Sequence, residues 1–162
     1  MKIIGFDPGS RFFGIGLLEK KGKNISYLYS QVINLKEKDI LSRFKTLWSE
    51  LDLFFIKNDL DGDSHLYAAI EDGFTGKNIK SADTLSKIRG IIIASLISRE
   101  IDMKIFSPRE IKKAITGNGN ADKVQIARMI STLLKIDTDK LKDDETDAIA
   151  IAYCHALFLK GG

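Results

Sequence analysis

The chain has 162 residues, which is the length of one domain with its own hydrophobic core, and we expect a single domain over residues 1–162. Apolar residues make up 44% and charged residues 29%, as in an ordinary globular protein. The one cysteine, Cys154, excludes an internal disulfide, and one cysteine with two histidines cannot complete a zinc motif. Any bound metal would therefore need oxygen ligands. The net charge of +3, from 25 basic and 22 acidic residues, is only a weak sign of an anionic partner.

The sequence favours a protein that stays inside the cell. Its longest apolar stretch, residues 148–154, is far shorter than the roughly 20 residues that a transmembrane helix needs. Charged residues interrupt the N-terminal apolar run too early for a signal peptide. Together with the single cysteine, these features predict a cytoplasmic protein.

The first half of the chain predicts strands with one helix among them. Short runs rich in apolar, β-branched and aromatic residues predict four strands, at residues 2–7, 12–18, 25–33 and 66–70. Pro8 and Gly9 end the first run, and the short connection at 21–24 indicates that the early strands pair in sequence order. Apolar residues recur with helical spacing from Ile40 to Ile56, which predicts a helix there.

The second half predicts helices with one strand among them. We expect a strand at residues 103–106 and helices at 81–101, 108–116, 121–135 and 143–159. Ser107, Pro108 and Glu110 supply an N-cap, a proline at the first helical position and a capping-box glutamate. The order β-β-β-α-β-α-β-α-α-α predicts an α/β fold: a five-stranded mixed sheet flanked by helices on both faces.

Four carboxylates are expected at one edge of this sheet. Asp7 and Glu71 each follow an apolar strand, and ligands of open α/β sheets lie at the carboxyl ends of the strands. Asp144 and Asp147 share one face of the last helix, whose small residues at 148–152 allow it to press against the sheet. Such a cluster needs counter-charge, which hard divalent cations supply. Two Mg²⁺ ions about 4 Å apart are a known device for in-line attack on a phosphodiester.

Other interpretations of the same acids remain open. Acids in a first helical turn usually interact with the helix dipole. Asp143 lies next to Asp144 and is the residue most easily mistaken for one of the metal-binding acids. Asp7 in an Asp-x-Gly turn also fits an actin-like ATPase, although the chain is short for the two such domains which that fold needs. A non-catalytic module that binds branched DNA is a third interpretation, but binding alone would not retain four like charges near a phosphate.

Several motifs occur in order along nearly the whole chain. They lie at residues 5–11 (Gly-Phe-Asp-Pro-Gly-Ser-Arg), 14–16, 69–71, 74–78, 89–90, 108–112, 116–123 and 144–152 (Asp-Glu-Thr-Asp-Ala-Ile-Ala-Ile-Ala). In this order and spacing they resemble the RuvC family of Holliday junction resolvases, which has a ribonuclease H-like fold. The resemblance implies that Asp7, Glu71, Asp144 and Asp147 are catalytic, metal-binding acids.

The resemblance also implies an activity and its partners. Members of the family are Mg²⁺-dependent endonucleases that cut two opposed strands of a four-way DNA junction symmetrically, in recombination and repair. They act as homodimers, a branch-migration helicase complex is a further implied partner, and Mn²⁺ is expected to substitute for Mg²⁺. A related nuclease that prefers flaps or three-way junctions would share the same motifs, so the substrate shape stays open.

The charge pattern fits DNA bound around an acidic centre. Residues 104–128 hold six basic side chains against two acids, and residues 77–89 hold four against one, whereas residues 139–147 hold five acids and two lysines. The resemblance assigns phosphate contacts to Lys112 and Lys123. Lys123 also opens a helix, where backbone N–H groups favour an anion.

Two further features concern the junction and the dimer. The resemblance assigns base stacking at the junction centre to Phe74, which lies in a polar segment with no apolar periodicity. The helix around Gly90 to Ile97 is apolar nearly all round, which exceeds what one sheet face covers. Part of it is therefore a candidate dimer interface, unless the helix is fully buried.

Overall fold

The computed structural model describes residues 1–73 and 79–160 and contains one sheet in the order β3-β2-β1-β4-β5. Its strands are β1 (Lys2–Asp7), β2 (Phe12–Lys21), β3 (Asn24–Asn34), β4 (Leu66–Glu71) and β5 (Asp102–Phe106). The strand β2 runs antiparallel to β1 and β3, whereas β4 runs parallel to β1 and β5. The expected five-stranded mixed sheet is therefore confirmed.

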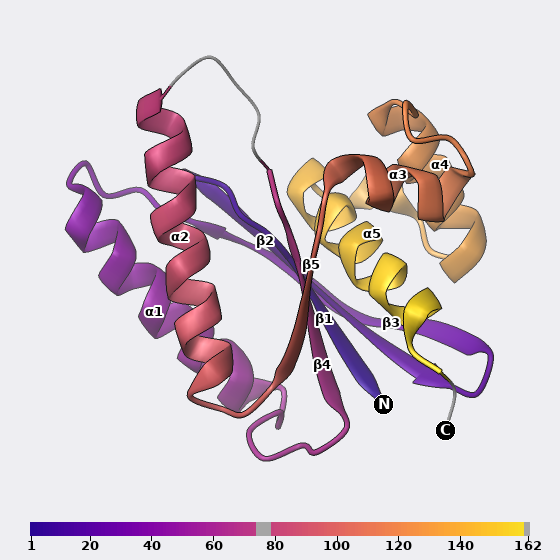
Figure 1. The fold of residues 1–162 in the computed structure, drawn as a ribbon, viewed down its shortest axis with the longest axis horizontal. Coiled ribbons are helices and arrows are strands. Elements are labelled where there is room, and N and C mark those ends of the chain that lie inside the picture. The colour runs from indigo at the N-terminus through magenta and orange to yellow at the C-terminus, as the bar shows by residue number, and fades with distance from the viewer. Residues whose placement is uncertain (74–78, 161–162) are drawn as a thin grey trace.

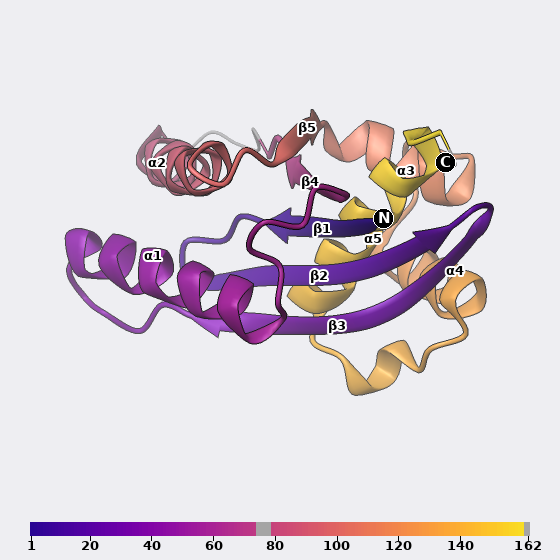
Figure 2. The same ribbon diagram turned by 90° about the horizontal axis from the view of Figure 1, so that it is seen from below.

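Helices cover both faces of the sheet, as predicted (Figures 1 and 2). One face carries α1 (Ile40–Lys57) and α2 (Ile79–Ile97), and the other carries α3 (Pro108–Thr116), α4 (Lys123–Leu134) and α5 (Asp143–Phe158). A short 3₁₀ helix at Thr138–Lys140 was not predicted. None of the helices in the described part of the chain is long and apolar enough to cross a membrane.

The helix expected to reach residue 101 ends at Ile97. Glu100 has a φ of 54°, in the left-handed region that a continuing helix does not use. The N–H of Ile101 instead bonds back to the carbonyl oxygen of Leu96 at 3.0 Å, which closes the helix end as a turn. The prediction was wrong here because Ile101 is apolar and buried, and an apolar pattern does not distinguish the last helical turn from the buried residue after it.

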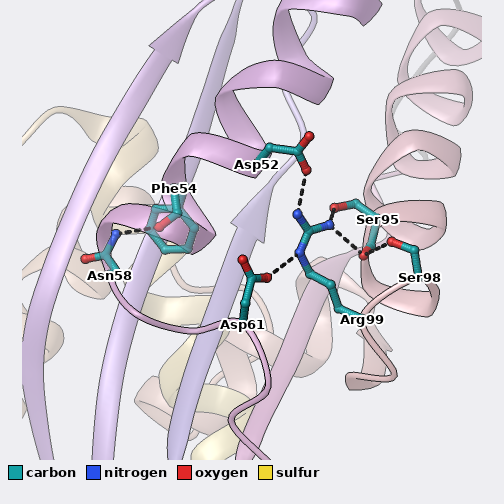
Figure 3. Close-up of polar contacts among 7 residues, drawn as sticks. All are labelled: Asp52, Phe54, Asn58, Asp61, Ser95, Ser98 and Arg99. Carbon is teal, nitrogen blue, oxygen red and sulfur yellow. Dashed lines mark hydrogen bonds and ion pairs between the residues drawn. The ribbon is translucent and has the colours of Figure 1, made fainter.

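The helices α1 and α2 pack on the sheet through large side chains. Phe54, Phe55 and Leu51 of α1 and Ile88 and Ile92 of α2 belong to one buried cluster. Arg99, just beyond α2, ties this layer together (Figure 3). Its guanidinium pairs with Asp52 and with Asp61, the latter at 2.9 Å, and lies 4.4 Å from the centre of the Phe55 ring.

The helix α5 packs on the sheet through glycines instead. A Cβ atom placed on Gly14 would lie 2.1 Å from the carbonyl oxygen of Asp144, and one on Gly5 would lie 2.1 Å from that of Ala148. One on Gly16 would lie 2.7 Å from the backbone nitrogen of Ile149. These separations are too short for real Cβ contacts, so the three glycines permit backbone-to-backbone approach. The close approach to the sheet that the small residues at 148–152 predicted is confirmed.

Candidate active site

Two acids end neighbouring parallel strands. β1 and β4 are in register from Lys2 opposite Leu66 to Phe6 opposite Ile70, and Asp7 and Glu71 are the last residues of the two strands. Pro8 follows Asp7 and cannot continue the ladder, because it lacks a backbone N–H. Both carboxylates therefore stand at the same edge of the sheet, as the sequence predicted.

Two more acids reach this edge from α5. Asp144 and Asp147 lie in the first turns of the helix, and the glycine contacts described above hold that end of α5 close to β1 and β2. All four acids line one pocket of about 340 Å³. The structure thus brings together Asp7, Glu71, Asp144 and Asp147 from three separate elements.

The carboxylates disturb one another's titration. Burial, and then the charges of Glu71, Asp147 and Asp144, raise the pKa of Asp7 from 3.8 to about 8. Burial and the charge of Asp147 raise the pKa of Glu71, although Lys112 and Lys123 act against this shift. Burial also raises the pKa of Asp147. The pocket is therefore short of positive charge, which is the property expected of a cation-binding site.

Both predicted lysines line the pocket. Lys112 comes from α3, whose start is defined by a capping box between Ser107 and Glu110. Lys123 begins α4, and its ammonium lies 3.0 Å from a carboxylate oxygen of Asp147. At the start of α4 the Asp122 carboxylate accepts from the N–H of Gln125 at 2.8 Å, so this one N–H of the first turn is already satisfied.

The remaining acids of the α5 segment face elsewhere. Asp143 lines a separate pocket of about 270 Å³, together with Asp139 and Asp147, and it does not line the four-acid pocket. Glu145 lies between the two candidate acids in sequence, but its carboxylate accepts a hydrogen bond from Ser30 of β3 at 2.8 Å. The geometry thus separates Asp144 from its neighbours, which sequence spacing alone could not do.

One charged residue of the pocket received no role from the sequence. Arg89 of α2 lines the pocket wall and donates to a carboxylate oxygen of Asp72 at 2.8 Å. Its places in the basic segment 77–89 and in the motif at 89–90 were signals in the sequence, but the contact with Asp72 joins two separate segments and shows only in the structure. Phe74, the predicted stacking residue, lies outside the described residues.

The donor set of the pocket fits divalent metal, although the acids are not gathered around one point. Within residues 1–73 and 79–160, no three side chains of the Asp, Glu, His or Cys type are close enough to form a ready cation site. Lys123 instead supplies positive charge to Asp147. Four carboxylates with no sulfur or imidazole suit a hard cation such as Mg²⁺, which needs only one or two carboxylates beside water and phosphate oxygens.

Comparisons with known proteins point to one family. A family model described as crossover junction endodeoxyribonuclease RuvC matches residues 3–155. The RuvC of Thermosipho melanesiensis (strain DSM 12029 / CIP 104789 / BI429) is 35% identical over 158 residues, which cover 97% of this chain and 98% of that protein. The RuvC of Psychrobacter sp. (strain PRwf-1) is 35% identical over 154 residues, or 95% and 79% of the two chains.

A solved structure shares the fold. The structure of T. thermophilus RuvC in complex with Holliday junction substrate matches with a TM-score of 0.86 and 21% identity, covering 98% of this chain and 94% of that one. This likeness confirms the ribonuclease H-like architecture. The match over residues 3–155 and the relatives at 35% identity lead to one conclusion: the chain belongs to the crossover junction endodeoxyribonuclease RuvC family.

Proposed function

We propose that this chain is a metal-dependent endonuclease that resolves four-way DNA junctions by paired symmetric nicks, in recombination and repair. The observation that carries the proposal is the pocket in which Asp7, Glu71, Asp144 and Asp147 meet beside Lys112 and Lys123. Family membership supports a nuclease over the ATPase alternative. The related T. thermophilus protein was solved with a Holliday junction substrate, which supports the choice of substrate. The catalytic unit is one domain over residues 1–162, acting in the cytoplasm.

The four acids would hold two Mg²⁺ ions, with Mn²⁺ as a substitute. When bound, the metals supply an activated water and charge for the leaving oxygen. The acids would fix where these ions sit. Lys123 pairs with one carboxylate oxygen of Asp147 at 3.0 Å, so the other oxygen of Asp147 could hold a metal. The Lys123 ammonium would then stand beside the metal, where it could contact a phosphate oxygen.

Lys112 and Lys123 would hold the backbone of the cut strand. Each phosphate contact releases condensed counterions, so removing one lysine should lower affinity for all DNA shapes alike. We expect Lys112→Ala to weaken junction binding and to reduce the slope of log affinity against log salt by about one. Lys113→Ala, which changes a neighbouring lysine outside the pocket lining, is the matched control. Equal slopes for both variants would count against the assignment.

Phe74 would stack on bases at the junction centre. The proposal rests on the resemblance alone, since this residue lies outside the described part of the chain. A Phe74→Ala variant should bind and cut junctions less well while cutting at the same positions. Junction resolution at the wild-type rate would exclude the stacking role.

The dimer would form through the outer side of α2. Ile88, Ile92 and Leu96 are buried against the sheet, whereas Gly90, Ala94 and Ile97 are exposed. The small residues Gly90 and Ala94, beside the apolar Ile97, would let the α2 helix of a second copy approach closely. An Ala94→Arg variant should therefore sediment as a monomer at micromolar concentration, where the wild type is a dimer. A branch-migration helicase complex would be a further partner.

The deciding experiment compares DNA shapes. A synthetic four-way junction, a flap, a three-way junction and a linear duplex are each incubated with the protein in Mg²⁺ or Mn²⁺. We expect paired nicks at symmetric positions of the four-way junction, which disappear in Asp7→Asn. Binding without nicks in either metal would favour the non-catalytic module, and faster cutting of flaps or three-way junctions would favour the related nuclease.

A further inference from the structure

The strand β3 contains a bulge that re-aims its side chains. Leu17 of β2 pairs with Tyr29 of β3, but the next residue, Leu18, pairs with Tyr27, so Leu28 has no partner in the β2–β3 ladder. Tyr27 packs toward the cluster beneath α5, whereas the Tyr29 ring lies 6.3 Å from the ring of Phe54 on the opposite face. In a regular strand these two tyrosines would point the same way. The extra residue therefore reverses which side chains of β3 point to each face of the sheet.

The bulge places the hydroxyl groups of Tyr27 and Ser30 on the face of the sheet that α5 covers. With the bulge between them, Tyr27 and Ser30 face the same way, and their side-chain oxygens are 3.0 Å apart. The Ser30 hydroxyl, which is buried, donates to one carboxylate oxygen of Glu145 at 2.8 Å. The other carboxylate oxygen of Glu145 accepts from the backbone N–H of Lys142 at 3.1 Å. Both oxygens are thus occupied outside the four-acid pocket.

The opposite end of α5 has a tie of its own. The Lys20 ammonium, on the buried side of β2, donates to the carbonyl oxygens of Ala156 at 2.6 Å and Leu159 at 2.5 Å. Lys20 and the Tyr27–Ser30–Glu145 chain therefore bind the two ends of one helix to the sheet. Only the second tie adjoins Asp144 and Asp147.

We propose that the Leu28 bulge and the Tyr27–Ser30–Glu145 hydrogen bonds form a positioning device for the first turn of α5. The glycines set how close α5 lies to the sheet, but a smooth glycine surface does not fix the rotation of the helix about its axis. A directional bond from Ser30 to Glu145 fixes that rotation, because Glu145 shares a helical turn with Asp144 and Asp147. Ser30 and Glu145 are positioning residues, and their role rests on the metal-binding function proposed for the two aspartates.

The test measures metal binding without DNA. Mn²⁺ is titrated calorimetrically into the full-length protein, and wild type is compared with Ser30→Ala, Glu145→Ala, the double variant and Lys20→Met. We expect Ser30→Ala and Glu145→Ala each to weaken Mn²⁺ binding by about 10-fold, as is usual for groups that orient metal ligands. The double variant should be no weaker than either single variant, because one bond is lost in all three. Ser30→Thr, which keeps the hydroxyl, should restore binding.

Lys20→Met separates positioning from stability. It removes the tie far from the acids, so its melting temperature should fall while its Mn²⁺ affinity stays that of wild type. Wild-type Mn²⁺ affinity in Ser30→Ala, or an equal loss in Lys20→Met, would overturn the proposal. Should Ser30→Ala fail to fold, Tyr27→Phe removes only the hydroxyl that bonds to Ser30 and should still weaken Mn²⁺ binding, by less than the 10-fold expected for Glu145→Ala.

Failure of the metal site itself has a different signature. Asp144→Asn should abolish most of the wild-type Mn²⁺ heat signal. If wild type and Asp144→Asn give the same titration, the proposed metal site is wrong and the positioning device falls with it. If they differ and Ser30→Ala matches the wild type, only the positioning device is wrong.

Discussion

The two helical layers are attached to the sheet in different ways. On one face, α1 and α2 rest on bulky side chains such as Phe54, Phe55 and Ile92. On the other, the backbone of α5 lies directly against Gly5, Gly14 and Gly16. Side chains can change rotamer to absorb a small change, whereas two touching backbones have nothing to adjust. The layer that carries half of the candidate acids is therefore the one that tolerates the least displacement.

The strongest test of this contrast is Gly14→Ala. The added methyl group would sit 2.1 Å from the carbonyl oxygen of Asp144, so α5 must move away from β2. We expect the free energy of unfolding to fall by about 3 kcal/mol or more and junction cleavage to be lost, since Asp144 moves with its carbonyl. Urea denaturation followed by circular dichroism measures the first effect. A wild-type denaturation midpoint would mean that the backbone contact is looser than described.

Asp7→Asn tests how much the ionised Asp7 carboxylate destabilises the folded protein in the absence of metal. The pKa of Asp7 is raised from 3.8 to about 8, so between these pH values the folded, metal-free protein holds more protons than the unfolded chain. Its free energy of unfolding therefore falls as the pH rises through this range. Asparagine carries no charge, so in EDTA at pH 8 the variant should be more stable than wild type, by at least about 2 kcal/mol.

The pH dependence provides the control for this prediction. Thermal melts in EDTA should show the gap between Asp7→Asn and wild type shrinking toward pH 4, where Asp7 of the folded protein is protonated and as uncharged as the asparagine. Mg²⁺ should narrow the gap at pH 8, because it stabilises the ionised wild-type acid. A gap that is constant from pH 4 to pH 8 would contradict the raised pKa.

Arg99→Ala tests the other layer. Arg99 pairs with Asp52 and Asp61 (Figure 3), and its guanidinium also lies over the Phe55 ring. Its side chain is only 16% exposed, but both acids are more open to water. We expect a loss of about 1–2 kcal/mol in the free energy of unfolding, with the cleavage rate of the folded protein unchanged. Lys87→Ala, which removes an exposed ion pair with Asp83, is the matched control and should cost under about 0.5 kcal/mol. Slower cleavage by fully folded Arg99→Ala would mean that the α1–α2 layer also affects the active site.

The smallest effect is expected for Gly90→Ala, the same substitution as Gly14→Ala in the opposite layer. Gly90 lies within α2 and a Cβ atom there would meet nothing within 4 Å. Alanine is the better helix former, so the variant should be more stable than wild type by about 0.5–1 kcal/mol. Denaturation at submicromolar concentration keeps dimer formation from contributing. If Gly90→Ala destabilised the protein as much as Gly14→Ala, the two helical layers would not differ in how they tolerate an added methyl group.

Much of this arrangement was predictable because its signals are local. The turn after Asp7 and the end of the strand at Glu71 can be recognised from adjacent residues, whereas the parallel pairing of β1 with β4 joins distant segments and comes from the structure. The small residues at 148–152 predicted the close approach of α5 to the sheet. In the structure, the contact of Gly14 with the backbone of Asp144 places the first turn of α5 at the edge that carries the other acids.

Other features depend on contacts between distant segments. The orientation of Glu145 toward Ser30 joins residues 115 positions apart, and no spacing rule distinguishes it from Asp144. The bulge at Leu28 interrupts the alternation of side chains in β3, and no glycine or proline in the strand indicates its position. The pairs Lys123–Asp147 and Arg89–Asp72 are likewise long-range, so the sequence showed only charges of opposite sign.

By itself, the sequence determined the element order, the strand ends that carry Asp7 and Glu71, and the helical face shared by Asp144 and Asp147. These follow from short-range patterns of apolar residues, turn formers and caps, whose physics acts over a few residues. Only the tertiary structure decided which acids share the pocket, which lysine pairs with them and how α5 is held at each end. Those choices depend on packing and directional bonds between segments that meet only when the whole sheet is assembled.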